Sequence, residues 1–354
     1  MRNPLEWWRH RQARRRYMPR TRVAKTGTIG RLSLAALVVI VAAAAVLEMR
    51  RGGDGDEELA AYARDSRLDP LDLVDVAGRS RRLLFLADIP SAAAPKRFAA
   101  AAIERLATGP GLDLVVLDVD AAEQPHIDRY LATSPEDASI LMSRPRAIRE
   151  DDGASRTFVD LYRTVWRVNQ ALGAHRRVRI VAADLQGWPP ARATSPHDAA
   201  RLFGQRDAHM LEAVTTRELA RNPGARVLFF VGGLHALKSG GGRIQTGGTR
   251  PVEVTWLAAQ LAERYPRDVY TILVDAAPSR AVTTDVVAYR GTDAADVMRR
   301  AGAGSGFGLR INDDFDRLSR TPVRTVGTTG LTFAFEPRNA PFSRLADAYI
   351  YFGN

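Results

Sequence analysis

The chain has 354 residues, which is enough to bury the core of one large domain or two small ones. Its net charge of +11 lies mostly in residues 1–31, where ten Lys or Arg accompany one acid, so the remaining residues are nearly balanced. This distribution argues against a nucleic-acid partner for the body of the protein. The absence of cysteine excludes disulfides, thiolate nucleophiles and cysteine-ligated metals.

The first predicted element is a membrane segment. Residues 32–47 contain no charge and rise about 24 Å as a helix, which is less than the roughly 30 Å of a hydrocarbon core. Arg31 can snorkel, however, and residues 26–30 then extend the helix. Because ten basic residues precede the segment and only Arg50 and Arg51 follow it closely, the positive-inside rule places the N-terminus in the cytoplasm.

The chain is therefore predicted to have four parts: a basic cytoplasmic tail (1–31), a single-pass signal anchor (32–48), a polar linker (49–72) and one α/β domain (73–354). This places the protein in the cytoplasmic (inner) membrane of a bacterium, with the domain facing the periplasm or exterior and the tail suited to anionic lipid. Two other interpretations of the apolar segment stay open. The small residues at 42–45 offer cleavage sites for a signal peptide, and the segment could be a buried core helix.

Beyond the linker, short apolar runs alternate with longer helical stretches, which indicates a mostly parallel sheet with crossover helices. Five runs are predicted to be parallel strands and the sixth an edge strand of either direction: Leu83–Ala87, Leu114–Leu117, Val178–Ala183, Val227–Val231, Val269–Val274 and Ala348–Phe352. The helical stretches are Lys96–Ala107, Ser155–Leu172, Arg206–Arg221 and Val252–Tyr265. The Gly-rich stretch Ser239–Gly248 is predicted to be a loop.

Carboxylates and one imidazole follow the predicted strands. Because ligands of open α/β sheets bind beyond the carboxyl ends of the strands, these side chains are expected to share one edge of the sheet. They are Asp88, Asp118, Asp120, Asp184, His235 and Asp275. Such a group suits general acid–base chemistry or a metal site. Each aspartate also has a structural interpretation, because an Asp just after a strand often caps the next helix.

His235 is the strongest single candidate, since Gly232 and Gly233 before it let the backbone approach a ligand closely. A neutral imidazole there can act as a base or metal ligand near pH 7. His209 is interpreted as part of a solvated helix face. The sequence has no phosphate-binding loop, no HExxH and no GxSxG, so it supports neither a nucleotide site nor a serine nucleophile.

Six short sequence fragments, taken in their order along the chain, form a further pattern. They are Glu123–Leu131 (EQPHIDRYL), Asp152–Val168 (DGASRTFVDLYRTVWRV), Val178–Leu185 (VRIVAADL), Gln205–Met210 (QRDAHM), Val227–Lys238 (VLFFVGGLHALK) and Leu345–Gly353 (LADAYIYFG). Over roughly residues 82–354 they resemble the erythromycin-esterase-like and ChaN-like superfamily, whose members include macrolide esterases and haem-binding lipoproteins. The Gln205–Met210 fragment is similar to the family's Arg-Asp-x-x-Met helix.

The resemblance implies roles for six residues. His235 would act as base or proton shuttle, Asp118 and Asp88 would orient water or metal, and Arg206 would stabilise a developing anion. Asp207 and Asp184 would help to bind substrate. The chain departs from the family at its first strand, where Asp88 stands for the Glu of the family's Gly-Glu-x-His and Pro90 stands for the His.

Two functions stay open because Pro90 can neither take a proton nor bind metal. The first is hydrolysis of an ester-type bond with reduced activity, since displacing a general base by one methylene can cost on the order of 100-fold. The second is a catalytically degenerate domain that binds a small-molecule ligand, haem or a metal, or that serves interaction. The sequence identifies no substrate and no cofactor, and it assigns no metal ligand.

Overall fold

The computed structural model describes residues 57–58, 60–89, 92–142, 153–173, 176–188, 196–245, 251–276, 286–288, 306–311, 324–326, 332–336 and 342–352. The chain divides into Met1–Asp54 and Gly55–Asn354, and every described residue belongs to the second unit. The predicted tail, the membrane segment at 32–48 and the start of the linker lie outside the described residues. Within the described ranges, no helix is both long and apolar enough to cross a bilayer.

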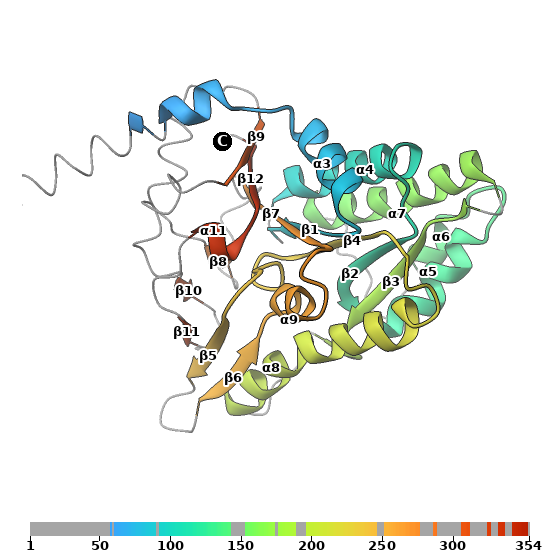
Figure 1. Ribbon diagram of the computed structural model, residues 1–354. Coiled ribbons are helices and arrows are strands. Elements are labelled where there is room, and N and C mark those ends of the chain that lie inside the picture. Colours follow the sequence, from blue (N-terminus) through green and yellow to red (C-terminus); the bar gives the residue numbers. More distant parts are fainter. Residues whose placement is uncertain are drawn as a thin grey trace, which may run out of the picture. The chain divides into compact units, whose positions relative to one another are not determined.

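A seven-stranded sheet forms the centre of the fold, with the strand order β3-β2-β4-β1-β7-β12-β9 (Figure 1). Its strands are β1 (Leu83–Asp88), β2 (Leu114–Asp120), β3 (Arg179–Asp184), β4 (Val227–Gly232), β7 (Val269–Asp275), β9 (Phe307–Arg310) and β12 (Ala348–Tyr351). All neighbours pair in parallel except β12 and β9. The predicted α/β class and the five parallel strands are confirmed, because continuous apolar runs are typical of strands that are buried on both faces.

The sixth predicted strand, β12, is not an edge strand. It lies between β7, with which it is parallel, and β9, with which it is antiparallel. The edge strand β9 has only four residues and begins inside a Gly-rich stretch, so its sequence carries little strand signal. Its Gly308 faces the helix α3 (Pro70–Ser80), where a Cβ would lie 2.7 Å from Leu73 Cδ2. Glycine therefore lets this helix pack closely against the edge of the sheet.

The folded domain begins before residue 73. Residues 60–65 are helical, and Ala60 and Ala63 are buried in the core. The N-cap of α3 is Asp69, whose carboxylate accepts the N–H of Leu71 at 2.8 Å. The second half of the range predicted as linker thus packs with the domain.

Helices cover both faces of the sheet (Figure 1). The helices α3, α4 (Ala93–Thr108) and α7 (Gly153–Leu172) pack together on one face, and α8 (Pro196–Glu212) and α9 (Leu257–Arg264) pack together on the other. The remaining helical elements are a 3₁₀ turn (Ala121–Glu123), α5 (Gln124–Leu131), α6 (Ser139–Met142), a π-helix (Ala213–Leu219) and α11 (Phe342–Leu345). The predicted helices at 96–107 and 155–172 are confirmed, and the one at 206–221 corresponds to the end of α8 and the π-helix.

A second, antiparallel sheet has the order β6-β5-β11-β10-β8. Its strands are β5 (Gly241–Gln245), β6 (Val252–Thr255), β8 (Val286–Ala288), β10 (Arg324–Val326) and β11 (Thr332–Glu336). Two predictions are wrong here. The Gly-rich stretch at 239–248 contains β5, and the stretch at 252–265 is strand β6 followed by α9, not one helix. A Cβ on Gly241 would lie 2.3 Å from the backbone oxygen of Val254, so glycine is what lets β5 and β6 approach.

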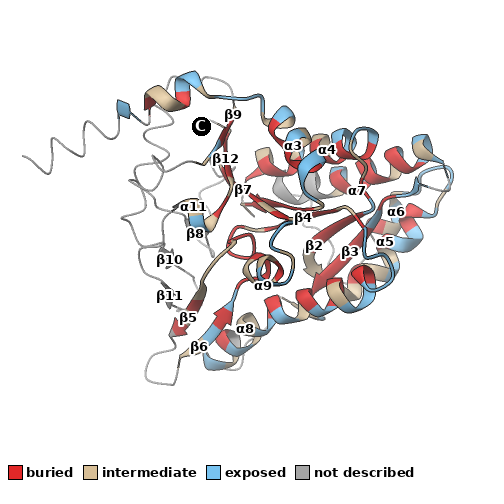
Figure 2. Ribbon diagram, viewed as in Figure 1, coloured by how far each residue is buried: buried red, intermediate tan, exposed pale blue. Residues whose placement is uncertain are grey.

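The core lies between the seven-stranded sheet and its helices (Figure 2). All six residues of β1, the central strand of this sheet, are buried. Phe85 on β1 stacks on Phe229 of β4 with ring centroids 4.2 Å apart, in the register of the parallel pair. This packing fixes the positions from which the chain leaves the sheet at the carboxyl ends of β1 and β4.

Candidate functional site

Polar side chains gather at the carboxyl edge of the parallel sheet. Asp88 ends β1, Asp118 lies near the end of β2, and Asp184 ends β3. His235 follows β4 after a short turn, in which its N–H donates to the oxygen of Gly232 at 2.9 Å. The helix α8 brings Arg206 and Asp207 to the same edge, although they stand at least 22 residues away from these strand ends in sequence.

His235 and Asp207 form a buried hydrogen-bonded pair. Nδ1 of His235 lies 2.9 Å from Oδ1 of Asp207, and both side chains are almost completely enclosed. The same Oδ1 accepts the N–H of Leu257 at 2.6 Å, at the start of α9. Oδ2 of Asp207 is buried and has no hydrogen-bond partner in the described part of the chain. A carboxylate only accepts, so in the neutral imidazole Nδ1 carries the proton and Nε2 the lone pair.

Arg206 is held by two carboxylates and two aromatic rings. Its Nε and Nη2 donate to both oxygens of Asp184 at 2.6–3.0 Å, and Nη2 lies 3.6 Å from Oδ2 of Asp118. The guanidinium carbon lies 4.6 Å from the ring centroid of Trp188 and 5.3 Å from that of Phe203. Burial lowers the pKa of Arg206, but Asp184 and Asp118 outweigh burial and keep the pKa above its ordinary value. The positive charge of Arg206 is therefore permanent and fixed in place.

Asp118 and His235 face the same small space above Gly232. Oδ2 of Asp118 accepts the N–H of Gly232 at 2.9 Å. A Cβ placed on Gly232 would lie 3.3 Å from that oxygen and 3.6 Å from Cδ2 of His235, which is the carbon next to Nε2. The absence of a side chain at this position thus leaves room between the carboxylate and the imidazole edge.

Asp88 has a partner that the sequence analysis missed. Lys96, in the first turns of α4, places Nζ 3.0 Å from both oxygens of Asp88, and both side chains are buried. Nζ also donates to the backbone oxygens of Ile89 and Ala92 at 3.2 Å. Burial raises the pKa of Asp88 to about 6, with a further contribution from the charge of Asp118 and an opposing one from Lys96. The sequence pattern could have indicated this pair, because Lys96 lies on the buried face of α4 together with Ala99, Ile103 and other apolar residues.

Two other predicted carboxylates of this edge have structural partners. Asp120 accepts the N–H of Ala122 at 2.9 Å and that of Gly187 at 2.9 Å, so it caps the turn after β2. Asp275 accepts the hydroxyl of Tyr349 at 2.8 Å. Pro90, where the resemblance departs from the family, lies outside the described residues. Among those that the structure describes, no three His, Asp or Glu side chains are placed to hold a metal ion.

The fold is shared with known structures at very low identity. A succinoglycan biosynthesis protein matches with a TM-score of 0.56 and 8% identity, over 84% of this chain and 96% of its own. A mutant of the erythromycin esterase EreC in an open conformation matches with a TM-score of 0.46 and 11% identity, over 79% of this chain and 92% of its own. ChaN of Campylobacter jejuni, described with cofacially bound haem, matches with a TM-score of 0.40 and 12% identity, over 59% of this chain and 87% of its own.

Both kinds of protein that the sequence resemblance names occur among the structural matches. No protein-family model matches the chain. No curated protein matches its sequence. At 8% identity and a TM-score of 0.56, the match to the succinoglycan biosynthesis protein shows the fold alone.

Proposed function

We propose that this chain is a hydrolase of an ester-type bond that uses His235 as its general base. The observation that carries the proposal is the buried pair of His235 and Asp207 beside the space above Gly232. An imidazole held by a carboxylate at Nδ1 presents its lone pair at Nε2, which is the arrangement needed to take a proton from water or from an alcohol. In this proposal Asp207 orients the ring.

The neighbouring side chains suit the same reaction. Asp118 faces the imidazole edge across the space above Gly232 and can accept a hydrogen bond from the attacking water. Arg206 supplies a permanent positive charge near this space, where it would stabilise the oxyanion that forms when water adds to a carbonyl. Asp184 accepts hydrogen bonds from Nε and Nη2 of Arg206, which hold the guanidinium in place.

A second function is favoured by one observation, the ion pair of Asp88 and Lys96. A carboxylate whose two oxygens both accept from a buried ammonium cannot at the same time act as a base or bind a metal. If the reaction needs Asp88 as a free carboxylate, the domain retains only a binding site. A catalytically degenerate ligand-binding domain is therefore the alternative.

An esterase assay on the full-length chain in detergent separates the two functions. The substrates are a series of p-nitrophenyl esters and aromatic lactones, with and without added Zn²⁺ or Mn²⁺. We expect hydrolysis by the wild type and a loss of roughly 100-fold or more in His235→Gln. His209→Gln is the matched control, because His209 lies on the same helix as Asp207 and is not one of the side chains described around His235. A folded wild type without activity on any substrate contradicts the hydrolase and favours the binding domain.

We also propose that residues 32–48 anchor the chain in the cytoplasmic membrane, with the α/β domain outside and the tail of residues 1–31 against anionic lipid. The support is the distribution of Lys and Arg around the apolar segment. In a bacterial host, the full-length chain should stay in the membrane fraction after a carbonate wash, and alkaline phosphatase fused after residue 354 should be active. A shortened chain in the soluble periplasmic fraction would show instead that the segment is a cleaved signal peptide.

A further inference from the structure

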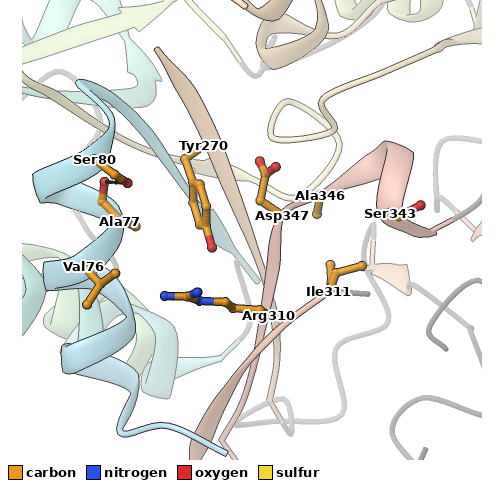
Figure 3. A pocket seen from close by; sticks show the side chains of 9 residues that line it. All are labelled: Val76, Ala77, Ser80, Tyr270, Arg310, Ile311, Ser343, Ala346 and Asp347. Carbon is orange, nitrogen blue, oxygen red and sulfur yellow. Dashed lines mark hydrogen bonds between the residues drawn. The ribbon is translucent and has the colours of Figure 1, made fainter. Parts of the chain in front are cut away.

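A cavity lies at the amino edge of the parallel sheet, opposite the carboxyl edge that carries His235. Its volume is about 410 Å³, within the usual range for small-molecule sites. Its lining comes from α3, from the start of β7, from the end of β9 and from the residues before β12 (Figure 3). Tyr270 is the second residue of β7 and Asp275 the last, so the cavity and the His235 edge are separated by roughly 17 Å of strand.

Two hydrogen-bond donors converge on this cavity. Figure 3 shows the hydroxyl of Tyr270 and the guanidinium of Arg310 pointing toward the same space beside Val76 of α3. Within the described residues, neither group has a hydrogen-bond or ion-pair partner. Burial raises the pKa of Tyr270 to about 12, with a further contribution from Asp347, so the phenol keeps its proton at neutral pH. One permanent positive charge and one neutral hydrogen-bond donor together favour binding of an anion.

Asp347 is the one carboxylate among the described lining residues, and it repels a bound anion only weakly. Asp347 forms an ion pair with Lys238, and its other oxygen accepts the N–H of Thr271 at 2.9 Å. In Figure 3 its carboxylate points away from the guanidinium of Arg310. The negative charge of Asp347 is thus largely offset by its own partners.

Apart from Ser80 and Ser343, the other described lining residues are aliphatic. Val76 and Ala77 come from one side and Ile311 and Ala346 from another. Val76 is 45% exposed, which is unusual for a large apolar side chain of this domain and leaves an apolar surface at the mouth of the cavity. A ligand that fits must therefore combine one small anionic group with a short apolar part.

We propose that this cavity is a binding site for a small aliphatic carboxylate. The carboxylate would accept two N–H groups from the Arg310 guanidinium, whose fork matches its geometry, and the hydroxyl of Tyr270. The carbon chain would lie against Val76, Ala77 and Ile311. The cavity shares no residue with the side chains gathered around His235 at the carboxyl edge. The proposal therefore does not depend on whether the chain is a hydrolase.

The test uses hexanoate as the probe and the full-length chain in detergent. Saturation-transfer NMR and calorimetry should show hexanoate binding to the wild type, with hexan-1-ol and hexylammonium binding at least tenfold more weakly. Arg310→Gln should weaken hexanoate binding by about tenfold or more, and Tyr270→Phe by a few-fold, because a charge-assisted contact is stronger than a neutral one. Arg344→Gln is the matched control, since Arg344 is an exposed arginine of α11 that does not line the cavity.

A second variant keeps the test independent of any effect of Arg310 on folding. Val76 is on the solvent side of α3, so Val76→Phe should fold normally, fill the mouth of the cavity and reduce hexanoate binding at least tenfold. The proposal is overturned if hexanoate binds the wild type no better than hexan-1-ol. It is also overturned if folded Arg310→Gln or Val76→Phe binds hexanoate as tightly as the wild type does.

Discussion

Nδ1 of His235 lies 2.9 Å from Oδ1 of Asp207, and that one oxygen also accepts the backbone N–H of Leu257 at 2.6 Å. The carboxylate therefore joins the turn after β4, the helix α8 and the start of α9 at a single buried point. His235 further secures α9, because its backbone oxygen accepts the N–H of Ala258 at 2.9 Å. The imidazole is held in one orientation by elements that are far apart in the chain.

The first prediction concerns the charge of Asp207. Asp207→Asn keeps an oxygen for Leu257 but removes the negative charge that fixes the imidazole tautomer. In the proposed hydrolase, kcat should fall by about 100-fold to 10,000-fold, with KM changed much less. Steady-state kinetics with the best ester substrate measures this, and Glu212→Gln at the exposed end of α8 serves as the control. A kcat within threefold of the wild type would exclude an orienting role for Asp207.

The second prediction concerns the buried pair of Asp88 and Lys96. Lys96→Met leaves Asp88 buried without its cation, so unfolding free energy should fall by about 3–5 kcal/mol. The double variant Asp88→Asn with Lys96→Met should recover much of this loss, because no unpaired buried charge remains. Urea denaturation of the wild type, Asp88→Asn, Lys96→Met and the double variant completes the double-mutant cycle.

A surface pair provides the control for that cycle. Arg243 and Glu253 are both exposed, so Arg243→Met should cost no more than about 1 kcal/mol. If Lys96→Met lowers the unfolding free energy no more than Arg243→Met does, the Lys96 ammonium stabilises the fold no more than an exposed ion pair does. An additive double variant would show that the two side chains do not interact energetically.

The third prediction follows from the pKa of Asp88, which burial raises to about 6. An unfolded Asp titrates near 3.9, so between about pH 4 and pH 6 the folded state binds more protons than the unfolded state. Stability must then fall as pH rises through this window, by about 3 kcal/mol in total. The difference in unfolding free energy between the wild type and Asp88→Asn, measured from pH 4 to pH 7, should show this slope. A carboxyl ¹³C titration of Asp88 with a midpoint near 4 would contradict it.

The sequence allowed six of the seven strands of the main sheet to be predicted, because these six are continuous apolar runs, which are typical of a sheet covered on both faces. The seventh strand, β9, was not predicted. The sequence also placed Asp88, Asp118, Asp184 and His235 at one edge, since the carboxyl ends of parallel strands meet there. Their use in a reaction stays a prediction. The second sheet could not be foreseen, because β5 is Gly-rich and the alternation in β6 covers only Val252–Thr255.

Side-chain pairing between neighbouring elements could not be predicted from the sequence pattern either. The contact between Lys96 and Asp88 depends on how α4 turns back onto the end of β1, and the apolar spacing of α4 fixes only its buried face. Asp275 illustrates the opposite error. It follows a strand at the expected edge, yet its carboxylate accepts the hydroxyl of Tyr349 and lies outside the contacts around His235. The position at the end of a strand therefore identifies candidate site residues. Which of them lie together depends on how the neighbouring elements pack.

The last prediction concerns the space above Gly232. Its φ is not in the left-handed region, so alanine adds no backbone strain there and the effect of Gly232→Ala is steric. The new Cβ would lie 3.3 Å from Oδ2 of Asp118 and 3.6 Å from Cδ2 of His235, which forces the carboxylate to move by a few tenths of an ångström. Ester hydrolysis should fall by roughly tenfold, because misplacing a catalytic group by about 1 Å costs on the order of 100-fold.

Gly224→Ala is the control for this variant, since its Cβ would meet only the side chain of Asn222 at 3.7 Å. Both variants should keep the thermal midpoint of the wild type within about 3 °C, because neither fills the apolar core. The imidazole ¹H–¹³C signals of His235 should shift in Gly232→Ala and stay in place in Gly224→Ala. Unshifted signals and unchanged hydrolysis in Gly232→Ala would mean that the space above Gly232 is not where the substrate reacts.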